Sequence, residues 1–161
     1  MMLVEIIPLG PGKIWFAGEP PQSGDEQMDQ TERPHLASQS LRVLIVEDEF
    51  FIALDTRALV TDLGHTVVGV AVSADQAVSM AERERPDVVL MDIRLNGARD
   101  GIDAADDILS RFGIRSLFVT ANTDPRTRQK AAAVHPLGFL EKPLTPERLR
   151  IGLSCFGKNS N

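Results

Sequence analysis

From Leu41 onward, short apolar runs alternate with longer stretches in which apolar residues recur every three or four positions. Between the first two runs, Ile52, Thr56 and Leu59 recur at helical spacing before Gly64, a residue that often ends helices. The short runs are rich in β-branched residues and cover Arg42 to Val46, Thr66 to Val72, Asp87 to Met91, Ser116 to Thr120, and Gly138 to Leu140. The pattern predicts five successive strand–helix units.

Local signals support four further helices between and after these runs. Ser73 is suited to the N-cap of the second helix, because its hydroxyl can accept a hydrogen bond from a free backbone N–H. The remaining helices are predicted to begin near Gly101, Pro125 and Pro146. Proline is tolerated in a first helical turn, where the N–H that it lacks would have no partner in the helix.

The central runs are apolar at consecutive positions, as in Val43 to Val46 and Val88 to Met91. Parallel strands buried on both faces have this pattern. Repeated strand–helix units with right-handed crossovers predict an α/β fold with a doubly wound parallel sheet, and five units fit the strand order 2-1-3-4-5. In such sheets the ligand site lies at the carboxyl ends of the strands, so functional residues are expected there.

The first forty residues differ in character from the rest of the chain. They contain Pro8, Pro11, Pro20, Pro21 and Pro34 and a polar stretch between residues 22 and 32. We therefore predict a leader over 1–40, a folded domain over 41–155 and a tail over 156–161. The leader is expected to be mobile, with a short hairpin around residues 4–16 as the alternative, because an isolated two-stranded hairpin is marginally stable.

Composition narrows the class of protein further. In 161 residues, 43% are hydrophobic and the formal net charge is −6, which allows a packed core but opposes nonspecific binding to DNA phosphates. Cys155 is the single cysteine, so no intramolecular disulfide can form, as is typical of a reducing compartment. No apolar run is long enough to span a membrane and no signal peptide is recognisable, so we expect a cytoplasmic protein.

Polar residues gather where the predicted strands end. In chain order they are Glu47-Asp48-Glu49, Asp92, Thr120-Ala121 and Lys142-Pro143. Because these ends meet at one edge of the sheet, the carboxylates are expected to lie close together. Neighbouring carboxylates repel one another, which raises a pKa or demands a cation, and Mg²⁺ prefers such oxygen ligands.

Two residues of this group are poor metal ligands but suit a phosphoryl group. The ammonium of Lys142 and the hydroxyl of Thr120 can stabilise the charge on phosphoryl oxygens. No serine, cysteine or histidine stands at these strand ends, so a carboxylate is the natural nucleophile, and Asp92 follows the central apolar strand. The sequence therefore predicts an aspartyl phosphate on Asp92.

These motifs, taken in order, resemble the receiver domain of response regulators. The resemblance runs from about Leu41 to Leu153 and rests on Val46-Glu47-Asp48-Glu49, Met91-Asp92-Ile93, Asp100-Gly101-Ile102, Val119-Thr120-Ala121 and Glu141-Lys142-Pro143. It implies a five-stranded flavodoxin-like fold and a two-component phosphorelay. A histidine kinase or histidine phosphotransfer protein would donate phosphoryl to Asp92, with Mg²⁺ as the cofactor.

The resemblance also implies roles for individual residues. Asp92 and Asp48 would bind the metal directly, Glu47 would bind it through water, and the backbone carbonyl of Arg94 would be a further ligand. The phosphoryl oxygens would be bound by Thr120, Ala121 and Lys142.

A conformational switch is a further implication of the resemblance. In the family the threonine moves toward the phosphate and an aromatic residue on the last strand turns inward, and these positions are Thr120 and Phe139 here. The surface that responds comprises the fourth helix, fifth strand and fifth helix. Residues two positions after the aspartate and after the threonine tune the lifetime of the phosphate, and here they are Arg94 and Asn122.

The chain departs from the family's commonest pattern after Asp92. Between Ile93 and Gly101 the usual Met-Pro pair is absent and the loop is one residue longer. Gly97 can form a turn where the family has a rigid proline, so we expect a different loop path without loss of the phosphoacceptor. Phe50 and Phe51 also stand out, because adjacent residues cannot both face the core of one helix, and we expect one of them to be exposed.

These observations predict a stand-alone receiver, because no region after Leu153 is long enough for an output domain. Expected partners are a sensor histidine kinase or histidine phosphotransfer protein and a downstream protein, with no direct contact to nucleic acid or membrane. A phosphorylation-dependent homodimer stays open. We expect no enzymatic activity beyond Mg²⁺-dependent self-phosphorylation and dephosphorylation, since an aspartate-nucleophile phosphatase would need an aspartate where Arg94 stands. A phosphorylation-independent binding module is the alternative.

Overall fold

The computed structural model describes residues 40–121, 124–154 and 156. The predicted leader and its alternative hairpin lie outside the described residues, as do Asn122, Cys155 and residues 157–161. The predicted domain boundary near Ser40 therefore stays a prediction.

Five strands and five helices alternate along the described chain, as the hydrophobic pattern predicts. They are β1 (Arg42–Val46), α1 (Phe50–Asp62), β2 (Thr66–Ala71), α2 (Ala74–Glu84), β3 (Val88–Asp92), α3 (Gly101–Phe112), β4 (Ser116–Thr120), α4 (Pro125–Ala132), β5 (Gly138–Glu141) and α5 (Pro146–Ser154). The strand limits differ from the prediction by single residues, and Asp92 is the last residue of β3. No helix in these described ranges is long and apolar enough to cross a membrane.

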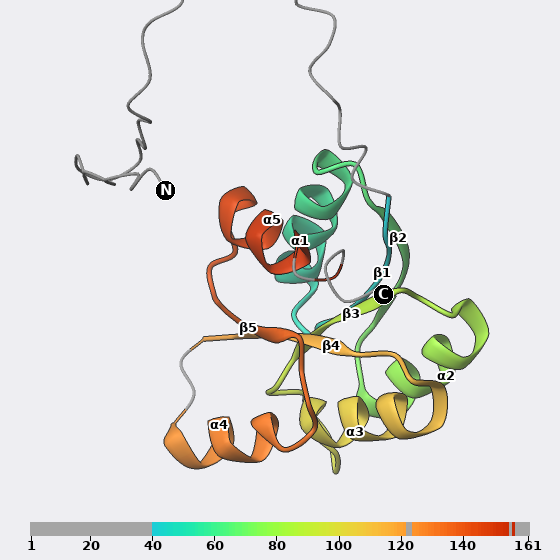
Figure 1. The fold of residues 1–161 in the computed structure, drawn as a ribbon, viewed down its shortest axis with the longest axis vertical. Coiled ribbons are helices and arrows are strands. Elements are labelled where there is room, and N and C mark those ends of the chain that lie inside the picture. The colour runs from blue at the N-terminus through green and yellow to red at the C-terminus, as the bar shows by residue number, and fades with distance from the viewer. Residues whose placement is uncertain (1–39, 122–123, 155, 157–161) are drawn as a thin grey trace, which may run out of the picture. The chain divides into compact units, whose positions relative to one another are not determined.

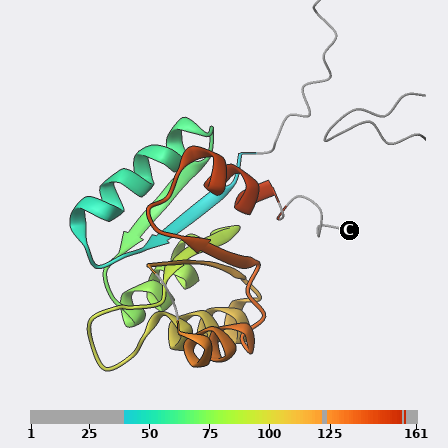
Figure 2. The ribbon, with the colours of Figure 1, turned by 90° about the vertical axis from the view of Figure 1, so that its left-hand side faces the viewer.

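The strands form one parallel sheet in the order β2-β1-β3-β4-β5, which confirms the predicted topology. Figure 1 shows α1 and α5 on one face of the sheet and α2, α3 and α4 on the other, and Figure 2 shows the same three layers from the side. β1 and β3 pair in the middle of the order, with Val46 opposite Met91. The residues that follow β1 and end β3 are therefore neighbours in space.

Alternate residues of the central strands contribute to two separate hydrophobic cores. Leu44 and Val46 of β1 face the core under α2 and α3, which also contains Phe118 of β4. Val43 and Ile45 face the core under α1 and α5. Successive strand residues point to opposite faces, so the four buried positions of β1 after Arg42 all carry apolar residues.

The start of α3 fixes the backbone beside the end of β3. Asp100 caps the helix by accepting hydrogen bonds from the backbone N–H groups of Ile102 and Asp103, each at 2.9 Å. The Asp103 carboxylate accepts in return from the Asp100 N–H at 3.0 Å. At Gly101, a Cβ atom would lie 1.9 Å from the carbonyl oxygen of Asp92, so only glycine allows this close approach.

Candidate functional site

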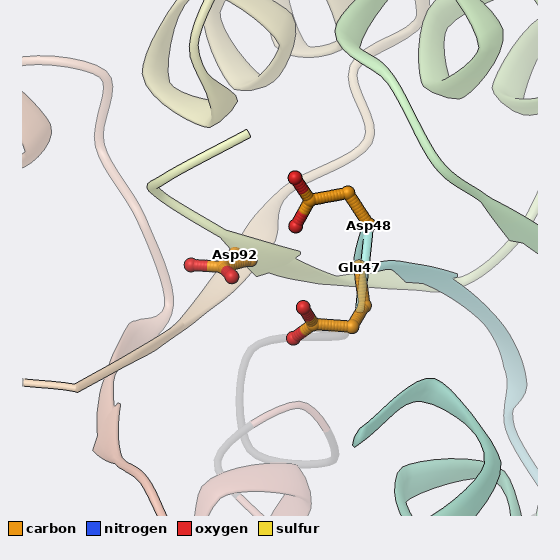
Figure 3. Close-up of side chains that lie close together, drawn as sticks. All are labelled: Glu47, Asp48 and Asp92. Atoms are coloured by element: carbon orange, nitrogen blue, oxygen red, sulfur yellow. The ribbon is translucent and has the colours of Figure 1, made fainter. Parts of the chain in front are cut away.

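Three carboxylates meet at the carboxyl edge of the sheet. Glu47 and Asp48 directly follow β1, and Asp92 ends the neighbouring strand β3. Oxygen atoms of these three residues lie within 4.8 Å of one another, and Figure 3 shows Glu47 and Asp48 extending toward Asp92. Glu47 and Asp92 are buried, with exposed fractions of 4% and 5%. Three carboxylates this close together, two of them buried and Asp48 partly exposed, favour the binding of a cation.

Lys142 follows β5 and reaches into the same cluster. Its Nζ atom lies 2.6 Å from Oε2 of Glu47 and 2.8 Å from Oδ2 of Asp92. The Lys142 backbone N–H donates to the Thr120 carbonyl at 2.9 Å, which ties the lysine to the end of β4. One ammonium therefore balances only part of the negative charge of the three carboxylates.

The pKa values of Glu47 and Lys142 reflect two opposing effects, burial and the hydrogen bonds between charged groups. Burial raises the pKa of Glu47 above its ordinary value, although the hydrogen bond from Lys142 opposes the rise. Burial by itself would lower the pKa of Lys142, but hydrogen bonds to Asp92 and Glu47 outweigh it and raise that pKa. Lys142 is therefore held charged, while the charge on Glu47 is costly without a further cation.

The donor set fits a hard divalent cation. It consists of carboxylate oxygens, which Mg²⁺ prefers over nitrogen or sulfur, together with open space beside Asp92 for water. Arg94 lies at the rim, where its backbone N–H donates to Oδ1 of Asp92 at 3.0 Å. That bond holds the Arg94 backbone beside the cluster, while its side chain is exposed.

A buried hydroxyl lies at the end of the neighbouring strand. Thr120, the last residue of β4, is only 1% exposed, and its Oγ1 atom has no hydrogen-bond partner among the described residues. A buried hydroxyl without a partner costs free energy, of the order of 1–3 kcal/mol. Such an atom is suited to a ligand that brings its own acceptor.

A cavity of about 500 Å³ opens beside Asp92 on the side of α1. Its polar wall includes Asp92, Arg94 and Lys142, and its apolar wall includes Ile52 of α1 and Leu144 of the β5–α5 loop. The cavity thus lets a bulky group approach the Asp92 carboxylate from the solvent.

The aromatic residue expected to switch on the last strand is partly buried and packs against the core under α2 and α3. Phe139 of β5 stacks on Phe118, with ring centroids 5.6 Å apart and an angle of 23° between the rings. The guanidinium carbon of Arg128, from α4, lies 5.5 Å from the centroid of the Phe139 ring. Phe139 is therefore enclosed between the core and α4.

Two features of this edge go beyond what the sequence predicts. Asn96 donates to Asp48 across 48 positions of sequence, a contact that neither residue's local sequence signals. Phe50 and Phe51, of which we expected one to be exposed, are both exposed, at 72% and 76%. The buried face of α1 is instead formed by residues that lie deeper along the helix, namely Ala53, Thr56 and Val60.

Comparison with known proteins identifies close structural and sequence relatives. Residues 43–153 match the family model described as the response regulator receiver domain. The chain is 36% identical over 128 residues to the phyllosphere-induced regulator PhyR of Methylorubrum extorquens. The matched region covers 79% of this chain and 47% of PhyR. The chain therefore spans about half the length of that relative.

Solved structures show the same similarity. The signal receiver domain of a modulated diguanylate cyclase from Desulfovibrio desulfuricans superposes with a TM-score of 0.70 at 35% identity, over 74% of this chain and 95% of that one. The anti-anti-sigma factor PhyR from Bartonella quintana superposes with a TM-score of 0.63 at 32% identity, over 76% of this chain and 49% of that one.

Proposed function

Because the chain belongs to the response regulator receiver domain family, we propose that it accepts a phosphoryl group on Asp92 from a histidine kinase or a histidine phosphotransfer protein. The observation that carries the proposal is the Asp92 carboxylate, which is buried beside two other carboxylates and Lys142 and faces an open cavity. A nucleophile at this position can be reached from solvent on one side and is held in place by protein groups on the other.

In the proposed reaction, a carboxylate oxygen of Asp92 attacks the phosphorus of a phosphohistidine. A P–O bond forms, the P–N bond breaks, and the leaving ring nitrogen keeps the electron pair and takes a proton from water to give neutral histidine. The ammonium of Lys142, 2.8 Å from Asp92, is suited to neutralise charge on the phosphoryl oxygens. The hydroxyl of Thr120 and the backbone of Ala121 complete the phosphoryl-binding groups.

We assign the cation, Mg²⁺, to Asp48 and Asp92 directly, to Glu47 through water, and to the backbone carbonyl of Arg94. Mg²⁺ supplies neutralising charge for the phosphoryl oxygens. The support from the structure is the excess of carboxylate charge over the single ammonium of Lys142, and the raised pKa of Glu47 that follows from its burial.

The proposed output is a change of surface at α4, β5 and α5. A phosphoryl group that accepts a hydrogen bond from Thr120 would stabilise one of two packings, and Phe139 would move with it. The buried, unpartnered Thr120 hydroxyl and the stacking of Phe139 between the core and Arg128 support this role. Arg94 and Asn122 would set the lifetime of the phosphate.

We propose that the switched surface binds a protein rather than DNA. The B. quintana relative is named an anti-anti-sigma factor, and the net charge of −6 opposes binding to DNA phosphates. The chain spans about half of the PhyR proteins, so their complete activity is not carried over. A homodimer formed on phosphorylation would use the same surface, and we expect no catalysis beyond the protein's own phosphorylation and dephosphorylation.

Phosphorylation is tested by incubating the full chain with Mg²⁺ and phosphoramidate and following its intact mass. We expect one added phosphoryl group in the wild type and in Asp55→Asn, an exposed carboxylate of α1 that lines the same cavity. Asp92→Asn should show none. Equal labelling of Asp92→Asn, or no labelling of the wild type at any Mg²⁺ concentration, would overturn the proposal.

A phosphorylation-independent binding module is the second candidate. The exposed side chains of Phe50, Phe51 and Leu54 on α1 favour it, because apolar groups clustered on a surface often mark a protein contact. The two functions separate once a partner is known. A module of this kind would bind its partner with the same affinity before and after phosphorylation. Its Asp92→Asn variant would also bind with that affinity.

A further inference from the structure

Asn96, in the loop between β3 and α3, donates hydrogen bonds to Asp48 of the acidic cluster from both its backbone and its side chain. The backbone N–H of Asn96 donates to Oδ2 of Asp48 at 3.0 Å, and its side-chain amide donates to the same oxygen. Asp48 lies at the end of β1, so this contact joins two neighbouring strands above the sheet edge.

The loop that carries Asn96 is anchored on its other side. Arg99 lies 2.9 Å from Asp75 of α2 and 2.5 Å from Asp107 of α3, and it also donates to the Asp103 carbonyl at 3.3 Å. Single exposed ion pairs contribute little, but one guanidinium with three acceptors has a restricted position. Gly97, at φ +133°, supplies the backbone turn directly after Asn96.

The two oxygens of Asp48 are consequently unequal. Oδ2 accepts both bonds from Asn96, whereas Oδ1 accepts no hydrogen bond from any residue in the described ranges. Elsewhere in the cluster, Glu47 and Asp92 use both of their oxygens as acceptors from protein groups. Asp48 therefore offers one oxygen that a cation can bind without competing with a hydrogen bond from the described residues.

We propose that Asn96 is a positioning residue for the cation site, an inference that rests on the proposed function. By holding Oδ2, the Asn96 amide orients Asp48 so that Oδ1 is presented to the divalent cation. A carboxylate restrained before binding loses less conformational freedom when the cation arrives, and partners of metal ligands typically affect metal affinity for this reason. The longer loop, which lacks the family's Met-Pro pair, supplies the donor.

The test is a calorimetric titration of the full chain with Mg²⁺ in the absence of any phosphoryl donor. We expect Asn96→Ala and Asn96→Leu to raise the dissociation constant about tenfold. The leucine variant removes the amide at similar size and without adding charge. Ala98→Asn, an exposed position of the same loop, is the matched control and should bind as the wild type does.

A second readout distinguishes positioning from damage to the site. The rate of labelling by phosphoramidate should reach the wild-type maximum in Asn96→Ala, with half-saturation shifted to about tenfold higher Mg²⁺. An unchanged dissociation constant, or equal weakening in Ala98→Asn, overturns the inference. A wild type that binds Mg²⁺ but is never labelled overturns the proposed function instead, and the calorimetric comparison still decides the role of Asn96.

Discussion

At the scale of single residues, Lys142 is the group on which the acidic cluster most depends. It is the ammonium that lies within 2.6–2.8 Å of Glu47 and Asp92, and its side chain is only 12% exposed. Breaking a buried pair leaves an uncompensated charge behind, which costs more than the pair contributes when intact. The contribution of Lys142 to stability is therefore expected to depend on the protonation of its partners.

We predict that Lys142→Met lowers the free energy of unfolding by about 3 kcal/mol at pH 7 without Mg²⁺. The loss should shrink near pH 5, because the pKa of Glu47 is already raised by burial and rises further without the lysine, so the carboxyl becomes neutral as the pH falls. Urea denaturation at the two pH values measures both effects.

Lys130→Met is the matched control for this substitution. Lys130 pairs with Asp100 and Asp103, but its side chain is 55% exposed, so we expect a loss below about 1 kcal/mol. Equal losses for the two lysines, or a loss at Lys142 that grows as the pH falls, would contradict the prediction.

At the scale of secondary structure elements, the junction of β3 and α3 sets the position of the phosphoacceptor. The Gly101 N–H donates to the Ile93 carbonyl at 3.0 Å, and its Cα lies against the Asp92 backbone without room for a side chain. The Asp100 capping box directs the helix away from this point. Movement of the α3 start would therefore move the backbone of Asp92.

We predict that Gly101→Ala lowers the free energy of unfolding by about 1–3 kcal/mol and slows labelling at Asp92, because the new methyl group meets backbone atoms that must shift. Thermal unfolding and the labelling rate measure these effects. Gly138→Ala on β5 serves as the control, since its added Cβ would lie at an ordinary 3.6 Å from Leu117. A Gly101→Ala variant as stable and as quickly labelled as this control would refute the argument.

At the scale of the whole molecule, charge is distributed unevenly. Six acidic and two basic residues precede Leu41, so −4 of the net charge of −6 lies in the first forty residues. Within the domain, the carboxylates of Glu47, Asp48 and Asp92 are concentrated at one edge of a sheet that has apolar cores on both faces. This concentration opposes folding until a cation binds.

We therefore predict that Mg²⁺ stabilises the protein, by about 2.7 kcal/mol at a concentration one hundred times its dissociation constant. Asp48→Asn should be more stable than the wild type without Mg²⁺, because one repelling charge is removed, and should gain little from the metal. Urea denaturation with Mg²⁺, or with NaCl of equal ionic strength, measures both quantities. The prediction is contradicted if NaCl raises the free energy of unfolding as much as Mg²⁺ does. It is also contradicted if Mg²⁺ stabilises Asp48→Asn as much as the wild type.

The hydrophobic pattern by itself determined the elements. The number of strand–helix units then led to the strand order, and the motifs at the strand ends led to the family. Five apolar runs with helical stretches between them are a local property, and Val43 to Val46 of β1 and Val88 to Met91 of β3 are all apolar because both faces of these strands are buried. Parallel strands then bring their carboxyl ends to one edge, so the meeting of Glu47, Asp48 and Asp92 follows from topology alone.

Only the tertiary structure decided how these groups pair. Lys142 contacts Glu47 across 95 positions and Asn96 contacts Asp48 across 48, and both contacts depend on side-chain and loop conformations that no local pattern encodes. The same holds for Gly101, whose need for glycine arises from the Asp92 carbonyl rather than from its own backbone angles. Hydrophobic periodicity indicates which face of an element is buried. Which side chains contact one another at the sheet edge depends on their distances and orientations in the folded chain.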